Sequence, residues 1–135
     1  MSPISDPARS LRYRGVWILI GWGLVAYTVY ASLSSSPPDG PSWLSDKMAH
    51  GLTYFILATW FAALYPPKDY LVIGAGLLAL GIALELLQAR TGYRYAEVAD
   101  GLANLAGILV GLAFGWASGG RWLAWFDRRL AAAIP

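Results

Sequence analysis

Hydrophobic residues are gathered into four long runs that are separated by short polar segments. The runs cover Gly15–Leu33, Met48–Tyr65, Leu71–Gln88 and Val98–Ala117. Crossing the hydrocarbon core of a bilayer, roughly 30 Å thick, takes about 20 helical residues, and each run approaches that length. The pattern predicts an all-α membrane protein with a bundle of four transmembrane helices.

The polar segments between the runs contain residues that end helices. Residues 34–46 are rich in proline and serine, Pro66 and Pro67 follow the second run, and residues 89–97 form a polar loop. After Gly119 and Gly120, residues 120–134 combine apolar positions at helical spacing with arginines that can reach anionic headgroups. We expect an interfacial amphipathic helix here, with Leu123, Phe126 and Leu130 on its apolar face and Arg121, Arg128 and Arg129 on its polar face.

Composition agrees with a membrane location. The chain has 135 residues, of which 57% are hydrophobic and 13% charged, about half the charged share of a soluble domain. Four spans nearly exhaust this length, so we expect one domain over residues 1–135. The absence of cysteine excludes disulfides and thiolate metal sites, and no nucleic-acid-binding motif is present.

Lysine and arginine are distributed unevenly between the two sides of the predicted bundle. One side carries Arg9, Arg12, Arg14, Lys68, Arg121, Arg128 and Arg129, whereas the other carries Lys47, Arg90 and Arg94. Basic residues in short loops favour the cytoplasmic side. We therefore expect both termini in the cytoplasm and loops 34–47 and 89–97 outside.

Polar residues recur on one face of three of the runs, close to the end that the topology places outside. Ionisable groups inside a span are costly and usually face the bundle interior or a wet cavity. Because successive spans alternate in direction, these residues should converge at the outer end of the bundle. They are Asp46, His50 and Tyr54 on the second run, Glu85 and Gln88 on the third, and Glu97, Asp100 and Asn104 on the fourth.

The order and spacing of these residues resemble the VanZ-like family. The matching pattern is D-K-x-x-H-x-x-x-Y, then E-x-x-Q, then R-x-x-E-x-x-D-x-x-x-N-x-x-G, which begins at Asp46, includes Lys47 and Arg94, and ends at Gly107. The resemblance covers about residues 46–115. It implies a small multi-pass protein of the bacterial cytoplasmic membrane, in a family named for a member that confers resistance to the glycopeptide teicoplanin.

Three interpretations of the polar residues stay open. The first is an outward-facing pocket that binds a lipid headgroup or a lipophilic glycopeptide, with Asp46, Lys47, Tyr54, Gln88, Arg94 and Asn104 as binding residues. The second is a membrane enzyme that modifies such a lipid, with Glu85, Asp100 and His50 for acid–base chemistry. The third is a structural network in which Lys47, Arg90 or Arg94 pairs with the acids.

A metal centre and a cofactor are not predicted. Asp46, Glu85, Asp100 and His50 offer suitable ligand atoms, but no recognised ligand spacing supports a metal site. Small residues recur every fourth position on the fourth run, a pattern that lets helices approach closely. We expect this ridge, which includes Gly107, Gly111 and Gly115, to pack inside the bundle against glycines of the third run, with a homo-oligomer contact as the alternative.

Overall fold

The computed structural model describes residues 10–36, 40–93 and 95–134, and this part of the chain is helical with no β-strand. The long helices are α1 (Arg14–Leu33), α2 (Asp46–Leu64), α3 (Tyr70–Ala89) and α4 (Val98–Ser118). A 3₁₀ turn, η2 (Pro67–Asp69), leads into α3, and α5 (Arg121–Ala133) closes the chain. The all-helical class is confirmed, and each helix begins and ends within two residues of its predicted run.

Local sequence explains the helix ends. Ser45 caps α2 by accepting a hydrogen bond from the backbone N–H of Met48 at 3.2 Å. Gly119 and Gly120 adopt left-handed backbone conformations with φ of 55° and 70°, which stop α4 and redirect the chain into α5. Side chains larger than hydrogen are strained in this conformation, so the two glycines fix the position of the turn.

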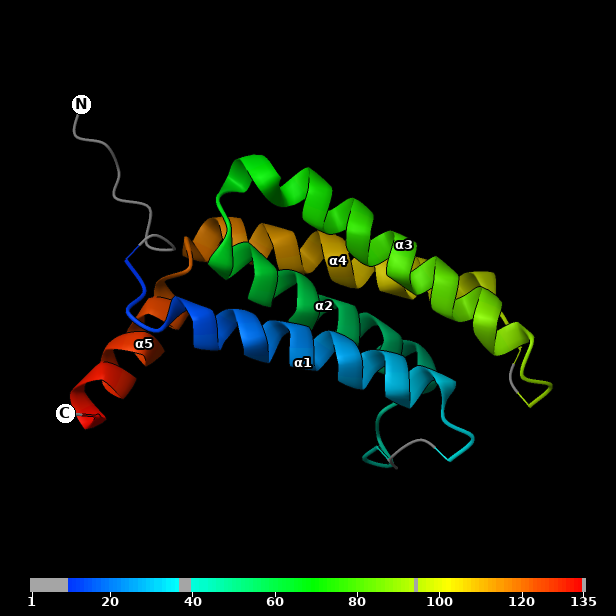
Figure 1. The fold of residues 1–135 in the computed structure, drawn as a ribbon. Coiled ribbons are helices and arrows are strands. Elements are labelled where there is room, and N and C mark those ends of the chain that lie inside the picture. The colour runs from blue at the N-terminus through cyan, green and yellow to red at the C-terminus, as the bar shows by residue number, and fades with distance from the viewer. Residues whose placement is uncertain (1–9, 37–39, 94, 135) are drawn as a thin grey trace.

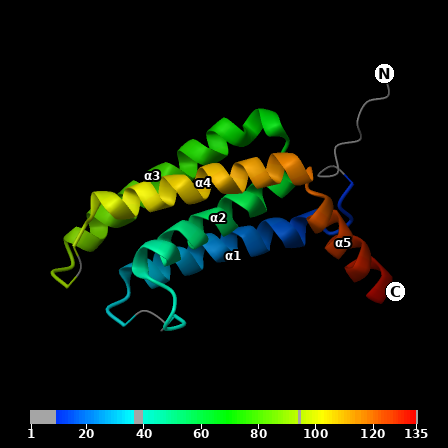
Figure 2. The same ribbon diagram turned by 180° about the vertical axis from the view of Figure 1, so that it is seen from behind.

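Helix α2 lies at the centre of the bundle, because it contacts α1, α3 and α4. Figures 1 and 2 show the four long helices side by side with alternating directions. The loops after α1 and α3 lie at one end, and α5 lies at the opposite end, where α1 begins and α4 stops (Figure 1). These alternating directions are what the predicted meeting of the polar residues at one end of the bundle requires.

Within the described residues, three segments are long and apolar enough to cross a membrane: Arg14–Leu33, Pro67–Ala89 and Val98–Ser118. Helix α2 is not among them, since Asp46, Lys47 and His50 lower the mean hydropathy of its N-terminal end. The structure thus supports a membrane protein with three candidate spans.

The small ridge of α4 packs against α2. A Cβ atom on Gly111 would lie 2.7 Å from the carbonyl oxygen of Phe55, and one on Gly115 would lie 2.3 Å from the Cβ atom of Ala62. Such distances are far below van der Waals contact, so only glycine fits. Packing inside the bundle was predicted, but α3 was the wrong partner, because spacing along one helix does not identify the helix that faces it. A homodimer that used the same ridge of α4 as its interface would require α2 to move away from α4.

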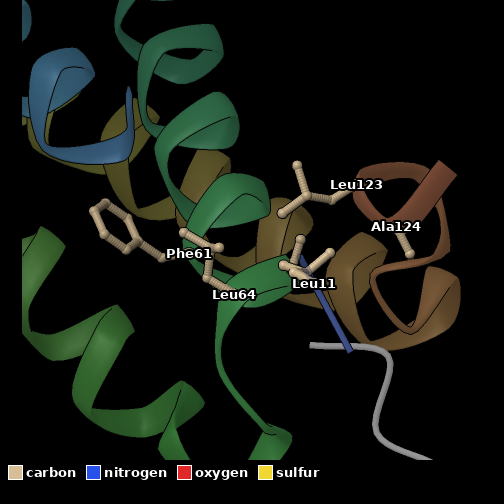
Figure 3. Close-up of a cluster of buried hydrophobic side chains, with 6 residues drawn as sticks. Leu11, Phe61, Leu64, Leu123 and Ala124 are labelled. Atoms are coloured by element: carbon tan, nitrogen blue, oxygen red, sulfur yellow. The ribbon is translucent and has the colours of Figure 1, made fainter. Parts of the chain in front are cut away.

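Helix α5 docks onto the bundle through a small hydrophobic cluster. Leu123 and Ala124 are buried against Leu11, Phe61 and Leu64 (Figure 3). Asp127 is also buried, and its carboxylate accepts hydrogen bonds from the backbone N–H groups of Arg12 (2.8 Å) and Tyr13 (3.0 Å) and from the Trp17 indole (2.8 Å). The predicted helix is present. Its apolar face is divided, since Leu123 packs on protein whereas Phe126 is half exposed.

Candidate functional site

Lys47 joins the N-terminal turns of α2 and α4. Its ammonium group donates hydrogen bonds to the carboxylates of Glu97, at 2.7 Å, and Asp100. It also lies 3.8 Å from an oxygen of Asp46. Asp100 is only 5% exposed, so Lys47 supplies the counter-charge that a buried carboxylate needs.

His50, one turn further along α2, is held by Asn104 of α4. The His50 Nδ1 atom lies 3.1 Å from the Asn104 Oδ1 atom, and the Asn104 side chain is almost fully buried. This contact holds the imidazole ring in one orientation. Nε2 lies 3.8 Å from a carboxylate oxygen of Asp100 and 3.9 Å from one of Asp46.

Glu85 reaches the same histidine from α3. One of its carboxylate oxygens lies 3.8 Å from His50 Nδ1, and its side chain is buried. The approach of α3 at this level depends on Gly81, where a Cβ atom would lie 3.0 Å from the Asn104 amide nitrogen and 3.2 Å from the Tyr54 hydroxyl. Glycine at this position therefore brings Glu85 to the polar groups of α2 and α4.

Gln88 and Tyr93 tie α3 and the following loop to α1. The Gln88 side-chain amide donates to the carbonyl of Ser32 at 2.7 Å, and the Tyr93 hydroxyl donates to the carbonyl of Leu33 at 2.9 Å. These carbonyls belong to the last turn of α1, where no intrahelical partner is left for them. Gln88, predicted as a binding residue, therefore has a structural hydrogen bond in this structure.

A cavity of about 460 Å³ opens beside His50, between α1, the loop before α2, α2 and α3. Asp46, His50, Tyr54 and Gln88 are the lining residues that were predicted from the sequence as site candidates. The full lining is Tyr27, Thr28, Ala31, Ser32, Gly40, Leu44, Asp46, Ala49, His50, Thr53, Tyr54 and Gln88. The size is within the range of small-ligand sites.

Most of the predicted polar residues do converge. Asp46, Lys47, His50, Glu85, Glu97, Asp100 and Asn104 form one connected set, which we call the polar cluster. Tyr54 lies next to it, whereas Arg94 lies outside the described residues. Sequence reasoning missed the contribution of α1 to the cavity, because Thr28 and Ser32 are small uncharged residues in an otherwise apolar run. The hydroxyl residues on one face of that run were the only signal available.

The polar cluster is acidic. Asp46, Glu85, Glu97 and Asp100 carry four carboxylates, and among the described residues of the cluster only Lys47 is a permanent cation. Lys47 is already bound to Glu97 and Asp100. The walls of the cavity therefore attract groups that donate hydrogen bonds or carry positive charge.

One set of side chains has the geometry to hold a metal ion. Asp46, His50 and Asp100 each offer a ligand atom, and these atoms lie within 4.8 Å of one another. These ligand atoms are evident from the sequence, but the sequence does not predict a metal site, because ligands on two helices show no recognised spacing along the chain.

A second cavity, of about 500 Å³, lies between α1, α2 and α3. Its lining is apolar apart from Asp69 and includes Trp22, Phe61, Ile73 and Leu77. Such a groove suits an acyl chain rather than polar chemistry.

No family model, curated protein or solved structure matches the chain. Function must therefore be argued from the geometry of the site itself.

Proposed function

We propose that the chain is a four-span protein of the bacterial cytoplasmic membrane, with the polar cluster near the outer surface and α5 on the cytoplasmic face. Helix α2 is as long as its neighbours, and α1, α3 and α4 shield much of its surface. A central helix needs less apolar surface than one that faces lipid on most sides. The uneven distribution of lysine and arginine supports the orientation.

We further propose that the cavity beside His50 binds the headgroup of an outer-leaflet lipid or of a lipophilic envelope ligand. The observation that carries this proposal is the cavity itself, which Asp46 and His50 line at one end of the bundle. Headgroups lie at that level in a bilayer. Buried charge converging on an open cavity is typical of binding sites.

The charge of the site favours a headgroup with an amine or several hydroxyl groups. Carboxylates accept hydrogen bonds from such groups, and Asp46 is 59% exposed at its side chain. A headgroup bound through its phosphate would require a free cation, but Lys47, the only lysine or arginine among the described residues of the polar cluster, is bound to Glu97 and Asp100. Membership of the VanZ-like family, and any link to glycopeptide resistance, rests on the resemblance of the motif alone.

Lipid retention tests the proposal. The protein would be extracted from nanodiscs containing equal amounts of phosphatidylethanolamine and phosphatidylglycerol, and the retained lipid identified by native mass spectrometry. Ala49→Leu adds bulk to the cavity wall, whereas Ala75→Leu makes the same change at an exposed position outside both cavities. We expect wild type and Ala75→Leu to retain phosphatidylethanolamine and Ala49→Leu to lose it. Equal retention by all three proteins would contradict the proposal.

Acid–base catalysis on the bound headgroup is the second candidate. His50 is in contact range of three carboxylates and also lines the cavity where a ligand would lie, so an imidazole is placed for acid–base chemistry. Incubation with labelled phosphatidylethanolamine, followed by chromatography of the products, distinguishes catalysis from binding. A labelled product that forms with wild type but not with His50→Gln would establish catalysis.

A further inference from the structure

Three potential ligand atoms in the polar cluster lie around a small space. His50 Nε2 faces an oxygen of Asp100 at 3.8 Å and an oxygen of Asp46 at 3.9 Å. Both distances exceed hydrogen-bonding range, so the three groups approach one another without bonding directly. A neutral imidazole and two carboxylates are groups that ligate metal ions in proteins.

The size of this space fits a metal ion. Since the ligand atoms lie within 4.8 Å of one another, a point equidistant from them is about 2.2–2.8 Å from each. Bonds from metal ions to nitrogen and oxygen ligands are about 2.0–2.6 Å long, so small side-chain movements suffice. The cavity beside Asp46 and His50 gives an ion access and room for water at its remaining positions.

The hydrogen bond between His50 and Asn104 orients the histidine. In metal-ligating histidines the ring nitrogen that does not bind the metal usually contacts a carbonyl or carboxylate oxygen, which fixes the ring orientation. Here Nδ1 lies 3.1 Å from the side-chain oxygen of the buried Asn104, and Nε2 faces Asp46 and Asp100. The histidine is oriented as a ligand.

Lys47 leaves part of the carboxylate surface available to an ion. Its single ammonium group is shared among Asp46, Glu97 and Asp100. Lys47 binds Oδ1 of Asp100, whereas Oδ2 faces His50, so the two oxygens of this carboxylate can serve the ammonium group and an ion together. A site with one imidazole and two carboxylates suits zinc or manganese better than magnesium, which prefers oxygen ligands alone.

We propose that Asp46, His50 and Asp100 form a binding site for a divalent transition metal ion of the zinc or manganese class. This inference does not rest on headgroup binding. An ion and an amine would compete for Asp46 and Asp100, so ion binding is measured in detergent without added lipid, separately from lipid retention.

The test uses full-length protein with an affinity tag that contains no histidine, stripped of metal by a chelator. Mn²⁺ binding would be followed by electron paramagnetic resonance of the free ion, and Zn²⁺ by competition with Mn²⁺. We expect one ion per chain. His50→Gln and Asp46→Asn should each weaken binding at least about tenfold, because each removes one of three protein ligands. Asp69→Asn, at the other end of the bundle, is the matched control and should bind as wild type does.

Asp46→Asn keeps the test independent of folding, because this side chain is 59% exposed and its loss leaves the bundle packed. Unchanged Mn²⁺ affinity in a folded Asp46→Asn protein, or no ion bound by wild type, would overturn the proposal. Wild-type protein that binds Mn²⁺ normally but retains no lipid would instead count against the headgroup proposal alone.

Discussion

Gly107 of α4 lies directly on Gly51 of α2. A Cβ atom at Gly107 would lie 2.1 Å from the Gly51 carbonyl oxygen and 3.0 Å from the Phe55 backbone nitrogen. Backbone meets backbone here, so no side chain can move aside. This contact sets the distance between the two helices that carry His50 and Asn104, because Gly51 directly follows His50 and Gly107 lies about one turn from Asn104.

Gly107→Ala should therefore destabilise the bundle. The added methyl group must push α2 and α4 apart, at a cost of about 1–3 kcal/mol in the free energy of unfolding. Gly101→Ala makes the same change on the same helix where nothing lies within 4 Å of the new methyl group. Thermal unfolding of the purified proteins checks this: Gly107→Ala should melt lower than wild type and Gly101→Ala should not. Equal melting temperatures would refute the close contact.

The helices and the convergence of the polar cluster could be predicted because both follow from local spacing. Asp46 and His50 are four residues apart, and Asp100 and Asn104 are also four apart, so each pair shares a helical face. Alternating helix directions then bring both pairs to one end. A charged residue inside a span usually faces the bundle interior, so Glu85 indicated which face of the third run points inward.

Partnerships between helices could not be predicted in the same way. The ridge on α4 requires a close neighbour but does not specify α2 rather than α3. Asp127 offered no signal that it would be buried, because a charged residue in an amphipathic helix is usually solvated. Two of its three donors are backbone N–H groups, of Arg12 and Tyr13, more than a hundred positions away along the chain. The pattern of side chains along the sequence does not indicate which backbone N–H groups will act as donors.

Lys47→Met should lower stability by leaving Asp100 without its counter-charge. Asp100 is buried, and a buried carboxylate that loses its partner destabilises the folded state. The double variant Lys47→Met/Asp100→Asn removes both charges and should recover most of the lost melting temperature in chelator-containing buffer. Lys68→Met, at an exposed position at the other end of the bundle, is the control. A single variant as stable as wild type would show that Lys47 does not compensate Asp100.

The docking of α5 should depend on pH through Asp127. Burial raises the pKa of this carboxyl, but hydrogen bonds from Trp17, Tyr13 and Arg12 outweigh it, and the pKa falls below its usual value. A depressed folded-state pKa means that the stabilisation is fully present above the unfolded pKa, about 3.9, and is lost as pH falls through the lower folded pKa.

Asp127→Ala removes the acceptor and should cost about 2–3 kcal/mol at neutral pH, because buried donors lose their partner. Its melting temperature should therefore approach that of wild type as pH falls below about 3.9. Unfolding of both proteins, followed by circular dichroism between neutral and acidic pH, measures the difference. A gap between the two proteins that stayed constant at acidic pH would contradict the role of the ionised carboxylate.

The proposed orientation predicts where fused reporters are active. An enzyme that works only outside the cytoplasm should be active when inserted between residues 34 and 46 or between 89 and 97, and inactive at the C-terminus. A reporter that works only in the cytoplasm should show the converse. Activity of the outside reporter at the C-terminus would invert the orientation and place α5 on the outer surface.

Glu85→Gln separates a working site from a structural network. Glutamine keeps the shape and hydrogen-bonding ability of the side chain but removes its charge. Gly111→Leu leaves the polar cluster chemically intact and obstructs the contact with Phe55 and Ala58 of α2. If the cluster binds or transforms a ligand, Glu85→Gln should accumulate normally in the membrane and lose lipid retention, whereas Gly111→Leu should lose protein.

If the cluster only holds the helices together, the two variants should behave alike. Removing one partner from a buried charged network costs about 3–5 kcal/mol, which is comparable to a severe packing defect. The measurements are membrane abundance, melting temperature and retained phosphatidylethanolamine for both variants and wild type. A Glu85→Gln protein that is as stable as wild type and also retains lipid would contradict both interpretations. The charge of Glu85 would then be needed neither for ligand binding nor for stability.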